Sequence, residues 1–197
     1  MATYGFCAGL NLTKTLSRMA ALIKRPLFGG AITAITPSNL IDASELRQIP
    51  DNQEVLLYPD SSVSIIVEIL QKVDPTDLKD AIKFHFDSLA YDNSAVSKTV
   101  NDIDIVPNER GDATPPAAVL SGVQEVPKFN RGIPDEVHVF MALYRVELKN
   151  IDLVVTFNVP TRSEDGGAVS AEGLATARVH FDTFVRSLQI VDFSLFA

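Results

Sequence analysis

The sequence contains only one cysteine and three histidines among its 197 residues. Cys7 alone excludes an intrachain disulfide, and one cysteine with three scattered histidines gives none of the ligand spacings of a metal site. A reducing compartment is therefore the default expectation. No apolar run approaches the roughly 18 residues of a membrane-spanning helix. We expect a soluble protein that carries no metal and no cofactor and does not enter a membrane.

Signatures of catalysis are absent as well. The sequence has no nucleophile elbow, dinucleotide-binding fingerprint, phosphate-binding loop or kinase motif. His85, His138 and His180 fall on a predicted helix, strand and helix, where packing or exposure explains each of them. We therefore expect a protein that acts by binding rather than by covalent chemistry.

Acidic residues are missing from one part of the chain and abundant in the rest. Residues 1–41 contain Lys14, Arg18, Lys24 and Arg25 and no acid, whereas the remaining residues carry 13 bases against 25 acids. A body of such charge repels nucleic acid and anionic lipid, and it favours a basic protein partner through electrostatic steering. Solubility alone would explain the same surface, so composition leaves both explanations open.

The basic N-terminal segment is expected to be separate from the fold. Residues 1–25 have the composition of a flexible leader, and three explanations remain open: an organelle transit peptide, a disordered tail, or a start at Met19. Folded structure is expected to begin near Pro26. We therefore predict a leader over residues 1–25 and a single domain over residues 26–197.

Hydrophobic periodicity predicts an α+β fold. Strand signals alternate with short turns, and the two longest, residues 136–148 and 151–159, should form the centre of a sheet because their middle parts are apolar on both faces. Asp74 and Pro75 predict the start of an amphipathic helix over residues 75–90, and a second helix is expected over residues 170–188. Short connections favour antiparallel pairing. The prediction is a mostly antiparallel sheet of six or seven strands, flanked by helices. The other expected strands span residues 31–35, 55–58, 63–70, 100–106 and 117–126.

Residues 46–55, here called the acidic corner, connect two apolar segments. Pro50 fixes its own φ, and Asp51-Asn52 is a typical turn dipeptide in which short polar side chains bond to the nearby backbone. Glu54 then enters the next strand. The pattern predicts a sharply held, solvent-facing turn, which is either a solvated loop or a binding surface.

Three motifs at and before the acidic corner resemble the N-terminal signature of the MOG family, the Ran guanine-nucleotide release factors. The motifs occupy residues 26–32, 41–47 and 49–55, in that order and with short gaps. Weaker similarities lie at residues 64–70, 84–86, 155–160 and 194–197. The resemblance covers residues 26–197 and leaves out the leader.

The resemblance implies a PsbP-like α/β sandwich that binds the small GTPase Ran, promotes release of its guanine nucleotide and supports nuclear protein import. It implies a monomer that acts in the nucleus and cytoplasm. In that family the acids of the turn motif contact Ran, and the matching positions are Asp51 and Glu54. Asp42, Arg47 and Gln53 match nearby and form a second tier. No role is implied for the loop over residues 93–116.

Two other functions remain open at this point. A PsbP-like structural or assembly protein of a photosynthetic compartment would fit the fold and the leader. A small-ligand-binding or enzymatic sandwich domain would need a deep polar pocket with convergent titratable groups.

Overall fold

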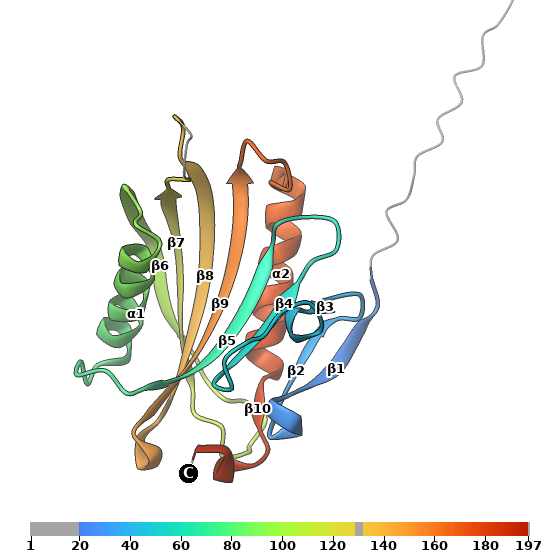
Figure 1. Cartoon of the computed structure of the whole chain (residues 1–197). Coiled ribbons are helices and arrows are strands. Elements are labelled where there is room, and N and C mark those ends of the chain that lie inside the picture. The colour runs from blue at the N-terminus through green and yellow to red at the C-terminus, as the bar shows by residue number, and fades with distance from the viewer. Residues whose placement is uncertain (1–19, 129–131, 197) are drawn as a thin grey trace, which may run out of the picture.

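Two sheets and two helices form a layered α+β sandwich (Figure 1). The computed structural model describes residues 20–128 and 132–196. The predicted fold class is confirmed, with seven strands in the larger sheet. In the described part of the chain, neither helix is long and apolar enough to cross a bilayer.

The larger sheet is antiparallel at every pairing, with the strand order β3-β4-β5-β9-β8-β7-β6. The two strands predicted for the sheet centre, β8 and β9, are inner strands, and most of their residues are buried. In chain order the strands are β3 (Ile41–Asp42), β4 (Gln53–Leu57), β5 (Ser64–Gln71), β6 (Ser97–Val106), β7 (Ala117–Val126), β8 (Asp135–Val146) and β9 (Ile151–Arg162).

A second, three-stranded sheet joins the two ends of the described chain. It has the order β1-β2-β10 and consists of β1 (Leu22–Leu27), β2 (Ile32–Pro37) and β10 (Gln189–Ile190). This sheet corrects the expected domain start, because β1 begins at Leu22 rather than near Pro26. Pro26 is accommodated inside β1, an edge strand, where a residue without an N–H is tolerated. Residues 1–19 of the expected leader lie outside the described residues.

The two helices begin at aspartate and serine caps. Helix α1 spans Leu78–Asp92, and the carboxylate of Asp77 accepts hydrogen bonds from the backbone N–H groups of Lys79 and Asp80. The start expected at Asp74-Pro75 is therefore a few residues early, because Asp77 is the residue that caps the free N–H groups. Helix α2 spans Ala171–Ser187 after the cap Ser170. Short 3₁₀ helices are η1 (Phe28–Gly30), η2 (Ala43–Glu45), η3 (Glu147–Lys149) and η4 (Phe193–Phe196).

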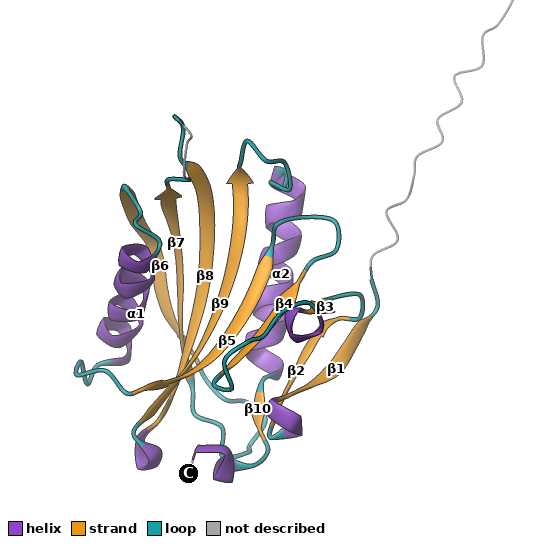
Figure 2. Cartoon of the chain, in the orientation of Figure 1, coloured by secondary structure: helices purple, strands orange, loops and turns teal. Residues whose placement is uncertain are grey.

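The larger sheet separates two hydrophobic cores. Helix α1 covers one face over β6, β7 and β8, whereas α2 and the smaller sheet cover the other face (Figures 1 and 2). The α2 side contains Phe157, which packs edge-on against Phe181 and Phe184 of α2. The α1 side is built around Ile82 and Phe86, which are fully buried. Because side chains alternate along a strand, each long strand supplies both cores.

Candidate functional site

The turn of the acidic corner is held by three hydrogen bonds. The N–H of Gln53 donates to the carbonyl of Pro50 (2.9 Å). The N–H of Ile69 in β5 donates to the carbonyl of Asn52 (2.9 Å), and the side-chain amide of Asn52 donates back to the carbonyl of Ile69 (3.2 Å). These bonds fix the turn against the sheet and leave Asp51 exposed at its tip. The predicted sharp, solvent-facing turn is confirmed.

Asp51 and Arg47 are the freest of the predicted site residues. Both side chains are exposed, and neither makes a hydrogen bond or ion pair with any residue that the structure describes. Leu46, beside Arg47, is 67% exposed. A carboxylate, a guanidinium and an apolar side chain are thus all available at the corner for contacts with another molecule.

Glu54 is half-buried, and the fold holds its side chain. Its Oε1 accepts a hydrogen bond from the backbone N–H of Phe28 (2.6 Å), which joins β4 of the larger sheet to η1 beside the smaller one. Phe28 has a left-handed backbone with φ of 49°. Partial burial raises the pKa of Glu54, and Asp42 adds to this rise, whereas the Phe28 N–H and Arg25 act to lower the pKa. One oxygen of Glu54 therefore has a structural partner.

Asp42 and Gln53 also have internal partners. Asp42 caps η2 by accepting a hydrogen bond from the N–H of Ser44 (2.8 Å). The amide of Gln53 donates to Glu68 Oε1 in β5 (2.7 Å). Gln53 and Glu54 are consecutive in β4, so their side chains point to opposite faces of the sheet. The five predicted residues therefore do not form one continuous patch.

Leu46 and Glu68 belong to this neighbourhood but were not predicted as site residues. Leu46 could have been found as an apolar residue flanked by Glu45 and Arg47 in a polar segment. Glu68 gave no local signal, because it reaches the corner only through the pairing of β5 with β4, where it faces Gln53. Burial raises the pKa of Glu68.

A second group of charged residues is buried under α1 and is here called the Asp152 centre. Asp152 is fully buried and accepts hydrogen bonds from Arg145 (2.7 and 2.9 Å), His85 (2.9 Å) and the N–H of Val73 (3.1 Å). Burial acts to raise the pKa of Asp152, but these hydrogen bonds outweigh it and lower the pKa to about 2. Every oxygen is occupied, so the centre fastens α1 and the preceding loop to the sheet.

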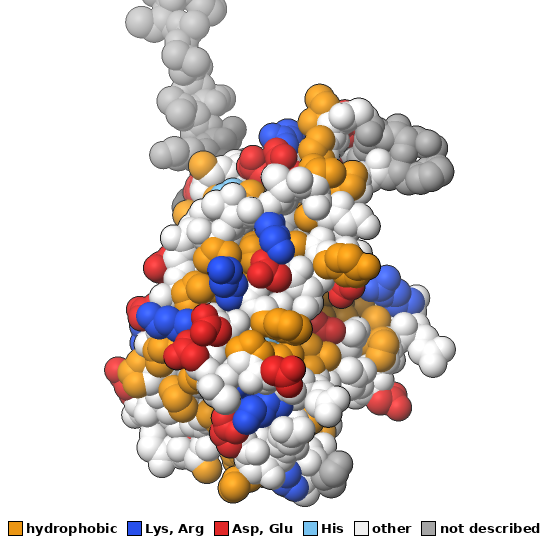
Figure 3. Space-filling view, turned by 90° about the vertical axis from the view of Figure 1, so that its left-hand side faces the viewer, with side chains coloured by type: hydrophobic (Ala, Val, Ile, Leu, Met, Phe, Trp, Pro, Cys, Tyr) orange, Lys and Arg blue, Asp and Glu red, His pale blue; other side chains and the backbone are white. Residues whose placement is uncertain are grey.

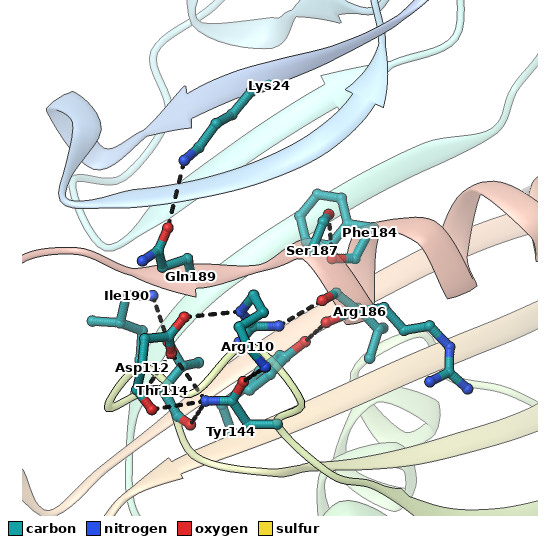
Figure 4. A network of polar contacts seen from close by, with 12 residues as sticks. Lys24, Arg110, Asp112, Thr114, Tyr144, Phe184, Arg186, Ser187, Gln189 and Ile190 are labelled. Atoms are coloured by element: carbon teal, nitrogen blue, oxygen red, sulfur yellow. Dashed lines mark hydrogen bonds and ion pairs between the residues drawn. The ribbon is translucent and has the colours of Figure 1, made fainter.

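The loop that carries Arg110-Gly111-Asp112 has a structural role. Asp112 accepts hydrogen bonds from Arg110 (2.9 Å) and from the N–H of Thr114 (2.8 Å), and the Thr114 hydroxyl accepts one from the N–H of Ile190 (3.0 Å). Figure 4 shows this network beside the end of α2, where Arg110 also donates to the carbonyl of Arg186. The loop thus fastens the end of α2 and β10 to the larger sheet.

The face covered by α1 is chemically mixed. Figure 3 shows acidic, basic and apolar side chains interspersed on it. Phe84 and Tyr91 of α1 are 48% and 84% exposed. Across residues 20–128 and 132–196, no group of three or more histidine, cysteine, aspartate or glutamate side chains could hold a metal ion.

The chain matches known proteins over most of its length. Residues 25–160 match the family described as Ran-interacting Mog1 protein. A Ran guanine nucleotide release factor from Danio rerio is 35% identical over 182 residues, which cover 88% of this chain and 100% of the relative. The human Ran guanine nucleotide release factor is 34% identical over 87% of this chain and 95% of its own length. The nuclear import protein MOG1 of Saccharomyces cerevisiae is 35% identical over 87% and 83%, respectively.

The fold is similar to solved structures as well. The crystal structure of the Saccharomyces cerevisiae Ran-binding protein Mog1p matches with a TM-score of 0.70 at 29% identity, covering 90% of this chain and all of that one. A Mog1 protein with a glutamate-to-alanine substitution matches with a TM-score of 0.67. The similarity in sequence and in fold therefore extends over most of the chain.

Proposed function

This chain belongs to the Ran-interacting Mog1 protein family, and from that membership we propose that it binds the small GTPase Ran, promotes release of Ran's guanine nucleotide and supports nuclear protein import. The observation that carries the proposal is the 35% identity to a Ran guanine nucleotide release factor along that relative's whole length. The yeast relative named as a nuclear import protein supports the transport role.

Release of nucleotide follows from binding alone. A protein that binds nucleotide-free Ran more tightly than loaded Ran weakens nucleotide binding by the same ratio, because the coupling between two ligands is reciprocal. Shifting Ran from 1% to 99% nucleotide-free would take about 5.5 kcal/mol of differential binding. The chain needs no covalent step and no cofactor for this role.

We propose the acidic corner as the Ran-binding site, with Asp51 as its principal contact. Asp51 is exposed on a rigid turn and has no internal partner among the described residues, so pairing with a lysine or arginine of Ran would break no bond of the fold. Arg47 is equally available. Glu54, Asp42 and Gln53 would act partly by holding the corner in shape, since each already has an internal bond.

The proposed working unit is one copy of the domain predicted for residues 26–197, extended to Leu22 at the start of β1. It would act as a monomer in the nucleus and cytoplasm. Neither nucleic acid nor membrane is part of the proposed role, in keeping with 25 acidic against 17 basic residues.

Two assays with purified Ran test the proposal. In the first, Ran loaded with a fluorescent guanine nucleotide is mixed with rising concentrations of the chain and excess unlabelled nucleotide. We expect a saturable acceleration of nucleotide release. In the second, the chain is immobilised and offered loaded or nucleotide-free Ran, and we expect stronger capture of the nucleotide-free form.

The outcomes separate binding from release. Equal capture of both forms, without faster release, would leave a Ran-binding protein but contradict the release mechanism. No capture of either form by the folded chain would contradict the whole proposal.

A further inference from the structure

A hollow of about 270 Å³ lies between the first half of α2 and the strands β6, β7 and β8, away from the acidic corner. Phe140 of β8 belongs to its lining and is almost fully buried. On the α2 side, Ala171 and Ala175 leave open space where larger side chains would fill it. The volume is slightly below the usual range for ligand pockets, so only a small molecule would fit.

Four polar side chains line this hollow without internal hydrogen bonds. They come from four separate elements: Asn101 of β6, Ser121 of β7, His138 of β8 and Arg178 of α2. None of these side chains makes a hydrogen bond with another residue in the described part of the chain; His138 lies 3.8 Å from a carboxylate oxygen of Glu136. Ser121 is buried and His138 is half-buried, whereas Asn101 and Arg178 are exposed. A few polar groups that converge on one partly apolar hollow are the usual arrangement of a small-ligand site.

The backbone of β6 is irregular at the residue that lines the hollow. Val100 pairs with Gly122 and Asp102 with Ser121, so Asn101 is an extra residue, a β-bulge. Bulges redirect side chains and are frequent beside binding sites. The bulge brings the amide of Asn101 to the hollow beside Ser121, which is 9% exposed.

Arg178 determines the charge of the ligand. Its guanidinium lies over the Phe140 ring, 5.4 Å from the ring centre, which holds it by a cation–π contact. The planar N–H fork makes no ion pair with any described residue. Such a fork binds a carboxylate with two parallel hydrogen bonds.

We propose that the hollow is a binding site for a small carboxylate with a compact apolar body, separate from the Ran-binding surface. The carboxylate binds the guanidinium of Arg178. The body packs on Phe140, Leu174 and the two alanines of α2, and Asn101 and Ser121 supply further hydrogen bonds. This assignment does not depend on the proposed interaction with Ran.

Benzoate is a suitable test ligand because it combines a carboxylate with a flat apolar ring. Nuclear magnetic resonance spectra of the ¹⁵N-labelled full chain are recorded during titration with benzoate, acetate or benzamide. We expect benzoate to bind with a dissociation constant on the order of 1 mM, as its size allows. The backbone signals of Ser121 and His138 should move. Acetate lacks the body and benzamide lacks the charge, so each should bind about 10-fold more weakly.

Three variants locate the site. Arg178→Gln should weaken benzoate binding by about 10-fold or more, because the charged fork is lost. Arg186→Gln, an exposed position on the same helix outside the hollow, should bind like the parent. Ala175→Leu should abolish binding by filling the hollow without changing any charge.

The assignment is overturned if benzoate does not bind the parent chain, if the moving signals lie elsewhere, or if Arg178→Gln and Arg186→Gln bind equally well. It is also overturned if Ala175→Leu, shown to be folded by its spectrum, retains parental affinity.

Discussion

The acidic corner and the Asp152 centre use carboxylates in opposite ways. Asp152 is fully buried and receives four hydrogen bonds from Arg145, His85 and the Val73 backbone. Asp51 is exposed and receives none from the described residues. A carboxylate whose oxygens are all occupied holds the fold together, whereas one that the fold leaves unpaired can serve a partner. Glu54 lies between these extremes, with one oxygen bound to Phe28.

The largest effect on stability is expected from Asp152→Ala. The substitution leaves Arg145 buried without its counter-ion and His85 without its hydrogen-bond partner, which costs about 3–5 kcal/mol of unfolding free energy. Asp51→Ala changes an exposed residue and should cost less than about 0.5 kcal/mol. Urea unfolding of both variants measures the contrast. Similar urea midpoints for the two variants would contradict the claim that Asp152 stabilises the fold and Asp51 does not.

Protonation of Asp152 should lower the stability of the protein at acidic pH. Its pKa is lowered from the ordinary value of about 3.9 to about 2, so its stabilising contribution is complete above about pH 5 and is lost as pH falls towards 2. The expected loss is about 2 kcal/mol. Carboxyl ¹³C signals followed from pH 6 to 1.5 would measure the titration directly. A midpoint of Asp152 near 4 would contradict this account.

A smaller effect is expected at Glu54. Glu54→Ala leaves the Phe28 N–H without its acceptor and should cost about 1–2 kcal/mol, whereas Glu54→Gln keeps an acceptor oxygen and should cost less than about 1 kcal/mol. The free energies of unfolding of the two variants in urea distinguish the loss of the hydrogen bond to Phe28 from the loss of the Glu54 charge. If neither variant is less stable than the parent, the link between the sheets through Glu54 is unimportant.

The sign of the pH effect at Glu54 is opposite to that at Asp152. Burial raises the pKa of Glu54, so protonation favours the folded state. The contribution of Glu54 to stability therefore increases as pH falls through its folded pKa towards the ordinary glutamate value. A Glu54 carboxyl signal that titrates below that value would contradict the assigned environment.

Local chemistry made part of this fold predictable. The hairpin of β4 and β5 follows from two apolar runs separated by a proline-containing turn, and the exposed turn at Asp51 follows from Pro50 and Asn52. The start of α1 was misplaced because Pro75 has the features of a first helical residue, although Asp77 is the one that caps the N–H groups.

Contacts between distant segments were not predictable from local patterns. The smaller sheet pairs residues 32–33 with residues 189–190, and no local pattern encodes that contact. Asp152 stands between Ile151 and Leu153 as the polar position of an alternating strand, which normally indicates exposure. Asp152 is buried because it bonds to Arg145, directly opposite it on the neighbouring strand β8, and to His85 on α1. The hollow beside Arg178 likewise needs four elements to meet.

The most direct test of the central claim compares two Pro-Asp turns at opposite ends of β4. Asp51 follows Pro50 and Asp60 follows Pro59, and both aspartates are exposed. Asp51→Asn and Asp60→Asn are each titrated against nucleotide-free Ran at physiological salt. We predict that Asp51→Asn loses at least about 2 kcal/mol, roughly 30-fold in affinity, while Asp60→Asn stays within about 3-fold of the parent. Parental affinity in Asp51→Asn would contradict the proposal that the unpaired carboxylate of the acidic corner contacts Ran.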